Sequence, residues 1–289
     1  MNVRGGTTQC LFTTAVHSSM TTNTTMSDSL KKLFPRAYFS RLIENNARSD
    51  GRSLMEVRKT RIVNPAITSA DASALCTIGR TSVICGIRYE IGPPITSKLQ
   101  SGRVEVRVEL GGLCSPNPSE TFSNRMEQAI RRMVDSGFID LEDLCIQEGK
   151  AVWVLKCHLI CLDDDGNLVD GCLLAFTSAI QEMNLPYNIV LAEDGSYRIL
   201  SPKTDKKVKT RFIHPTPLTL GIFDHGQIII ADPSAEEEAV LEALITVIMD
   251  SQSGDCTAVI KYGGPSISIQ QLSECMEACK RRKILFNNV

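Results

Sequence analysis

The sequence has little net charge and no long apolar run. Its 289 residues carry a formal net charge of −2, and no run of about 18 consecutive apolar residues occurs, so a membrane-spanning helix is not expected. A near-neutral chain is not typical of a protein that binds nucleic acid by itself. We therefore expect any nucleic-acid contact to involve a local patch or a surface shared with other subunits.

Several catalytic signatures are also missing. There is no Gly-x-Ser-x-Gly sequence, which argues against a serine nucleophile on a strand-to-helix turn. Neither Gly-x-Gly-x-x-Gly nor a Walker sequence occurs, so no nucleotide cofactor is predicted. These absences argue against a serine hydrolase and against an enzyme that uses a nucleotide cofactor.

The eleven cysteines include no Cys-x-x-Cys pair. Cys157 and Cys161 are four apart, as are Cys275 and Cys279. The first pair falls in an extended run, where residues four apart lie about 13 Å apart, and the second has no histidine close in sequence. We predict no metal site, and free thiols that indicate a reducing compartment, the cytosol or nucleus.

Composition places the rest of the chain among ordinary globular proteins, with 43% hydrophobic and 22% charged residues. Residues 1–29 are the exception: they are rich in Thr, Ser and Asn and show no apolar periodicity. We expect them to form a disordered extension rather than a signal peptide.

The first half predicts a helix, then a series of strands, and then two helices separated by one strand. Apolar spacing indicates a helix over residues 29–46, with Ser29 as a possible cap. Residues 103–110 alternate apolar and charged side chains without error, which predicts a half-buried strand. Its mixed charges favour a solvated face over an RNA patch. The other predicted elements are strands at 61–67, 74–78, 82–91 and 151–162 and helices at 120–136 and 168–183.

The second half repeats this order after a connection over residues 184–209, which contains a lysine cluster and a short predicted hairpin. Two further hairpins are predicted, 218–223 with 227–231 and 241–249 with 257–261. A helix over 269–284 closes the chain. Strands followed by a helix, twice over, predict an α/β sandwich (α+β sandwich) of two similar βα units.

The most informative stretch connects the strand at 151–162 to the helix at 168–183. Asp165-Gly166-Asn167 is a strong turn signal, and a helix that starts after a glycine turn offers free N–H groups that suit an anion. No Arg, Lys, Ser or Thr follows; Leu168 and Val169 come next, and Asp170 is expected to repel phosphate. The scaffold of a phosphate site is present without its side-chain ligands.

These residues resemble the RNase PH family of phosphorolytic 3′-exoribonucleases. Asp50-Gly51-Arg52-Ser53 is similar to the family's amino-terminal signature, and residues 72–86 are similar to its first hairpin. Residues 232–238, Asp-Pro-Ser-Ala-Glu-Glu-Glu, resemble a block of the catalytically silent ring subunits of the RNA exosome. The resemblance covers roughly residues 30–285. It implies a ribosomal protein S5 domain 2-like fold in two pseudo-repeated halves, 30–190 and 191–289.

In active members of this family, Asp-Gly is followed by Gly-Thr-Arg, whose Thr and Arg bind the attacking phosphate. Here Leu168 and Val169 stand at those positions. The resemblance therefore implies a degenerate phosphate site and no catalytic residues, cofactor or metal. The residues of that degenerate site are Asp165, Gly166, Asn167, Leu168 and Val169.

Three further groups carry weaker predictions. Asp232 and Glu238 have the spacing of the family's catalytic carboxylates, but we favour a capping or flanking role for residues 236–238. Arg125 is a weak candidate for RNA binding, because active relatives use an arginine near this region. Gly263-Gly264-Pro265 could cradle a phosphate, although a tight strand-to-helix turn is favoured.

The resemblance implies a non-catalytic structural subunit of the exosome ring that supports 3′–5′ processing and degradation of RNA in the nucleus, nucleolus and cytoplasm. The implied partners are other RNase PH-like subunits of a hexameric ring, a cap subunit with an S1 domain, and RNA in the shared channel. No association with a membrane is implied. Two alternatives stay open: an active phosphate-dependent exoribonuclease, and a free-standing RNA-binding protein.

Overall fold

The computed structural model describes residues 31–112, 114, 120–186, 189–192, 197–199, 204–210, 215–224, 226–251, 253–282 and 285–288. The chain divides into two compact units, residues 1–54 and 55–289. In the first unit, helix α2 spans Pro35–Glu44, with a proline in its first turn as the sequence predicted. The expected disorder of residues 1–29 and the cap at Ser29 lie outside the described residues.

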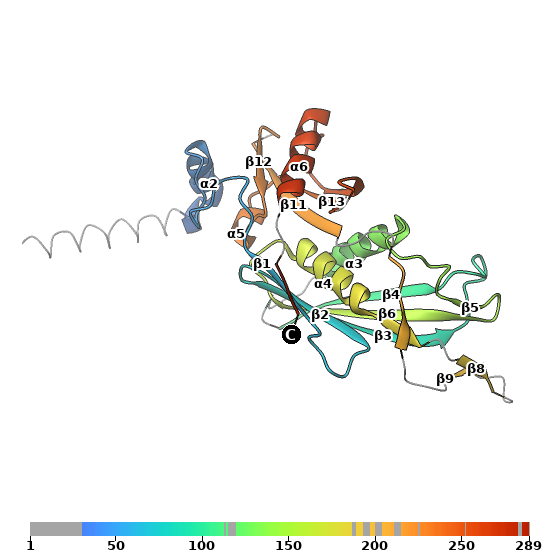
Figure 1. Cartoon of the computed structure of the whole chain (residues 1–289). Helices are drawn as coiled ribbons and strands as arrows, with labels where there is room; N and C mark the ends of the chain where they lie inside the picture. The colour runs from blue at the N-terminus through green and yellow to red at the C-terminus, as the bar shows by residue number, and fades with distance from the viewer. Residues whose placement is uncertain are drawn as a thin grey trace, which may run out of the picture. The chain divides into compact units, whose positions relative to one another are not determined.

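The second unit contains a seven-stranded sheet in the order β15-β1-β2-β3-β6-β4, with β5 paired to β6 (Figure 1). Its strands are β1 (Thr60–Asn64), β2 (Ala72–Ile78), β3 (Thr81–Gly92), β4 (Arg103–Leu110), β5 (Cys145–Gln147), β6 (Ala151–Asp163) and β15 (Leu285–Asn288). Strand β4 pairs with β6 in parallel, and helix α3 (Glu120–Asp135) lies in the connection between them. The predicted strand over 103–110 is confirmed, with Val106 and Val108 buried.

Helix α4 (Leu168–Glu182) packs on this sheet against β2 and β3. It is buried from Leu168 to Ile180, as expected of a helix with an apolar sequence on all sides. Such burial requires a second layer on its other side. That layer is β11, whose nine residues are all buried.

A second sheet of four antiparallel strands has the order β12-β11-β13-β14. The strands are β11 (Pro215–Phe223), β12 (Ile228–Ala231), β13 (Ala243–Asp250) and β14 (Cys256–Tyr262), which confirms both predicted hairpins. Helix α6 (Ile269–Arg281) covers the face opposite α4, where Leu218 and Leu220 pack with Cys275 and Cys279. Thr219, between those leucines, faces α4 through its bonds to Asp170.

Short strands connect the two sheets: β7 (Asn184–Pro186) pairs with β10 (Thr204–Lys207), and β8 (Ile189–Leu191) forms a hairpin with β9 (Tyr197–Ile199). One expectation about the chain's end is wrong. The last helix stops at Arg281, and residues 285–288 form strand β15, parallel to β1 at the edge of the first sheet. No helix of the described residues is long and apolar enough to cross a membrane.

Candidate functional site

The loop between β6 and α4 packs tightly against the segment that follows β12. Gly166 has φ +84°, and a Cβ at this position would lie 2.4 Å from the backbone nitrogen of Ala235. That nitrogen donates a hydrogen bond to the carbonyl oxygen of Asp165 (3.1 Å). Only glycine fits here, because the backbone of a second segment occupies the space of a side chain.

The backbone N–H groups at the start of α4 are bound by the protein's own carboxylates. The N–H of Asn167 donates to Oε1 of Glu238 (2.7 Å), and the N–H of Gly166 donates to Oδ1 of Asp164 (2.9 Å). Asn167 itself is left-handed, with φ +59°, and its side chain does not cap the helix. An internal carboxylate therefore stands where the positive end of the helix would attract an external anion.

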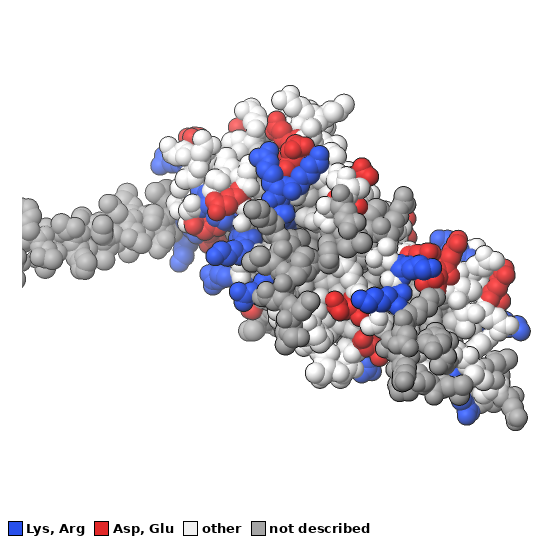
Figure 2. Space-filling model, in the orientation of Figure 1, with Lys and Arg blue, Asp and Glu red and all other residues white. Residues whose placement is uncertain are grey.

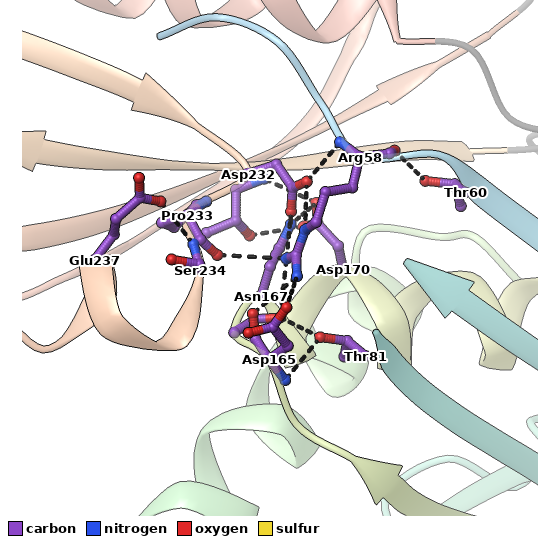
Figure 3. A network of polar contacts seen from close by, with 12 residues as sticks. Arg58, Thr60, Thr81, Asp165, Asn167, Asp170, Asp232, Pro233, Ser234 and Glu237 are labelled. Atoms are coloured by element: carbon purple, nitrogen blue, oxygen red, sulfur yellow. Dashed lines mark hydrogen bonds and ion pairs between the residues drawn. The ribbon is translucent and has the colours of Figure 1, made fainter. Parts of the chain in front are cut away.

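Arg58 joins this loop to Asp232 (Figure 3). Its Nε and Nη2 donate to the two oxygens of Asp232 (2.9 and 2.8 Å), and its Nη1 donates to the carbonyl oxygen of Asp165 (2.8 Å). Burial by itself would raise the pKa of Asp232, but the hydrogen bonds and charge of Arg58 outweigh it and hold the pKa well below its usual range. All three nitrogens of the guanidinium therefore donate hydrogen bonds to acceptors within the protein.

A second buried ion pair, Asp170 with Arg282, joins α4 to the end of α6, and both side chains are 0% exposed. Asp170 also accepts hydrogen bonds from the hydroxyl of Thr219 (2.6 Å) and from Nδ2 of Asn167 (2.9 Å). Asn167 Nδ2 bridges to Oδ1 of Asp232 (2.7 Å), which links the two ion pairs. Arg282 thus pairs with the charge of Asp170 inside the core, while that charge still raises the pKa of Glu238. The expectation that Asp170 repels phosphate stays a prediction.

The carboxyl group of Glu238 lies beside this loop, and its pKa is raised. Burial raises its pKa to about 7; the N–H of Asn167 acts against this, and the charge of Asp164 adds to it. Helix α5 (Ala235–Glu238), to which it belongs, starts with a capping box of Ser234 and Glu237. Glu237 accepts a hydrogen bond from the N–H of Ser234 (2.9 Å), and Glu238 accepts one from the N–H of Asn167, so both lie at helix starts as the preferred interpretation predicted. That they take no part in catalysis stays a prediction.

The degenerate phosphate site remains a prediction, but its parts can now be placed. Leu168 and Val169 are 2% and 6% exposed and belong to the core. Asp165, Gly166 and Asn167 form the loop that Arg58, Asp164 and Glu238 hold. Asp165 and Asp232, which are far apart in the sequence, both pair with Arg58 (3.5 and 2.8 Å).

Arg58 and Arg282 were missed in the sequence analysis. The only signal was that buried carboxylates need cations, which does not say which of 31 lysines and arginines supply them. Arg125 is exposed on α3, its guanidinium 5.6 Å from the ring centre of Tyr262; its role in RNA binding is untested. Among the described residues, no group of three His, Cys, Asp or Glu is arranged to hold a metal ion.

The fold and this site define the class of protein. The model of the 3′ exoribonuclease family, domain 1, matches residues 56–186, and that of domain 2 matches residues 215–282. The chain belongs to this family, the RNase PH family, and the predicted fold class is confirmed.

Particular relatives are similar over most of their length. Exosome complex component rrp43 of Schizosaccharomyces pombe is 30% identical over 257 residues, which cover 87% of this chain and 93% of the relative. Exosome complex component Rrp42 of Methanopyrus kandleri is 31% identical over 226 residues, covering 76% and 81%. A solved structure described as the Archaeoglobus fulgidus exosome with RNA bound to the active site matches with a TM-score of 0.70 and 29% identity, covering 85% and 93%.

Proposed function

We propose that this chain is a non-catalytic structural subunit of the hexameric RNA exosome ring, which supports 3′–5′ processing and degradation of RNA, including maturation of ribosomal RNA and turnover of messenger RNA. The relatives of highest similarity described above are named exosome complex components. The proposal extends that assembly to this chain.

The observation that carries the absence of catalysis is the hydrogen bond from the N–H of Asn167 to Glu238. A phosphorolytic site must bring inorganic phosphate to that helix end and hold it with cationic side chains. Here a carboxylate holds the position, and the two nearby guanidinium groups, of Arg58 and Arg282, are paired with Asp232 and Asp170. The side chains at 168 and 169 are apolar and buried.

The proposed partners are other RNase PH-like subunits, which form three pairs in the ring, a cap subunit with an S1 domain, and RNA in the shared channel. Permanent assemblies of this kind bury more than about 2,000 Å² at an interface. A shared channel also suits a chain with a net charge of −2, because the field acting on RNA is then collective. The proposed sites of action are the nucleus, nucleolus and cytoplasm.

A phosphorolysis assay tests the catalytic part of the proposal. Purified full chain is incubated with labelled RNA and inorganic phosphate, beside an active family member as a positive control. We expect no release of nucleoside diphosphates above background. Phosphate-dependent release would instead support the alternative of an active exoribonuclease, in which Asp232 and Glu238 serve as the catalytic carboxylates.

Purification of a tagged copy from cells tests the structural part. We expect the other ring subunits to co-purify in equal amounts and to be identified by mass spectrometry. A monodisperse monomer that binds RNA with strong salt dependence, and recovers no ring subunit, would contradict the proposal and support a free-standing RNA-binding protein.

A further inference from the structure

The structure brings together two basic runs that are far apart in the sequence. Arg58-Lys59-Thr60-Arg61 leads into β1, and Lys280-Arg281-Arg282 lies at the C-terminal end of α6. The runs meet because β15, just after the second run, pairs in parallel with β1, with Arg61 opposite Leu285. Figure 2 shows Lys and Arg side chains over the C-terminal end of α6 and beside β1. The small net charge of the whole chain therefore conceals a local excess of positive charge.

A cavity of about 400 Å³ lies between these runs. Four cations line it, Arg58, Lys59, Arg281 and Arg282. No carboxylate is among the lining residues that the structure describes, and the cavity is large enough for a small ligand. We name this feature the β1–α6 cavity.

Two of the four cations are paired with buried carboxylates. Arg58 is paired with Asp232, and Arg282 with Asp170. Lys59 and Arg281 are exposed and form no ion pair with any residue that the structure describes. Two positive charges at the cavity are thus left without a partner in the described part of the chain.

The end of a helix explains only part of this charge. Cations in the last turn of α6 offset the negative end of its dipole. Lys280, in that turn, pairs with Glu277 (3.1 Å), and Arg281 follows it. Lys59 comes from a different segment, so the dipole of α6 does not account for its position.

The wall of the cavity has one more unsatisfied group. Nε of Arg282 is buried and has no hydrogen-bond acceptor among the described residues. Because the side chain of Arg282 is 0% exposed, this donor lies beneath the cavity surface, and the exposed cations Lys59 and Arg281 are the groups that a ligand can reach.

We propose that the β1–α6 cavity binds a phosphate group of single-stranded RNA, with Lys59 and Arg281 as its two charged contacts. Phosphate suits donors that converge from separate segments, since its oxygens point in several directions. The apolar part of the lining, Met55, Val57 and Ala278, provides a surface for the attached ribose or base. The choice of RNA over another polyanion rests on the proposed function; ring assembly does not require this site.

The test is RNA binding by the full chain, measured by fluorescence anisotropy with a labelled oligouridylate between 50 and 200 mM salt. The variant Lys59→Ala/Arg281→Ala removes both proposed contacts. We expect its affinity to fall about tenfold or more. The slope of log affinity against log salt should fall by about one, since each phosphate contact on a single strand contributes about 0.7.

The matched control is Arg61→Ala/Lys280→Ala. It removes the same charge from the same two runs, at residues that do not line the cavity, and should change affinity less than threefold. Equal losses in both variants would show a diffuse charge effect and overturn the proposal. The conservative variant Lys59→Arg should keep most of the affinity.

Two further readouts separate the remaining outcomes. RNA carrying 4-thiouridine should crosslink to peptides from residues 55–60 or 278–282, and crosslinks confined to other segments would contradict the proposal. An acidic peptide that displaces RNA at equal concentration would instead identify a site for a protein segment. If the wild type co-purifies with ring subunits and binds no RNA, the RNA site is wrong and the proposed function stands. If the wild type binds RNA as described and recovers no ring subunit, the RNA site stands and the proposed function is wrong.

Discussion

The starts of helices α4 and α6 satisfy their backbone N–H groups in opposite ways. Helix α6 begins with a local capping box, in which Ser268 and Gln271, three residues apart, bond each other's backbone N–H groups. Helix α4 begins with a left-handed Asn167 whose N–H is bound by Glu238, 71 residues further along the chain. The first start is complete within one turn, and the second needs the other half of the protein.

The loops before the two helices show the same contrast. At Gly263-Gly264, both residues have positive φ, and the backbone carbonyl oxygens accept hydrogen bonds from Nζ of Lys261. Carbonyl oxygens that face a cation are not donors to an anion, so this geometry favours the tight turn that the sequence predicted. The loop before α4 has the N–H groups of an anion site, which the protein fills from within.

The largest expected effect on stability comes from breaking the buried ion pair between Asp170 on α4 and Arg282 at the end of α6. Asp170→Ala leaves the guanidinium of Arg282 buried without its counter-charge, and should lower the free energy of unfolding by about 3–5 kcal/mol. Urea denaturation measures this. Replacing both charges, in Asp170→Asn/Arg282→Met, should cost less than Asp170→Ala; a larger cost would show that Arg282 stabilises the fold through other contacts.

Arg58→Met should lower the free energy of unfolding at pH 7 by about 3 kcal/mol, because the buried Asp232 loses its partner. The pKa of Asp232 is lower in the folded protein than its ordinary 3.8. The pair therefore stabilises the wild type fully above that value, and its contribution falls as pH drops toward the folded pKa. Unfolding measured from pH 2.5 to 7 should show a steeper acid loss in the wild type than in Arg58→Met, and parallel curves would contradict this account.

Glu238→Gln tests the internal carboxylate at the start of α4. The folded pKa of about 7 lies above the ordinary 4.5, so the folded state binds more protons and the wild type loses stability as pH rises between these values. Glutamine keeps an acceptor for Asn167 and does not titrate. The variant should equal the wild type near pH 4.5 and exceed it by about 3 kcal/mol at pH 8.

The control for that change is Glu274→Gln, at an exposed carboxylate on α6. Its stability difference from the wild type should not depend on pH. If the two variants show the same pH profile, the effect at Glu238 is one of general charge rather than of its place at the helix start.

The smallest effect is expected at the local cap of α6. Ser268→Ala removes the acceptor of the Gln271 N–H (3.2 Å) and should cost about 1 kcal/mol. Ser266→Ala, two residues earlier on an exposed turn, should change stability by less than about 0.5 kcal/mol. Equal effects of the two changes would mean that the capping box adds nothing.

Elements with strong periodic patterns could be predicted from the sequence. The alternation in β4, the helical spacing in α3 and the turn signal between β11 and β12 each report a local preference or one buried face. Strand β15 was missed because nothing within residues 285–288 indicates that the chain returns to β1 in the first sheet. That pairing is a long-range contact, and no local pattern encodes its partner.

The candidate site likewise has features that the sequence could predict and features that it could not. The sequence by itself determined that the turn at Asp165-Gly166-Asn167 precedes a helix and that Leu168 and Val169 offer an anion no polar side chain, since both follow from residue type and local order. Only the tertiary structure decided that Glu238 fills the helix end and that Arg58 and Arg282 neutralise Asp232 and Asp170. Burying charge is favourable only when an opposite charge is brought to it, and folding, not sequence order, selects which of the many charged side chains comes close.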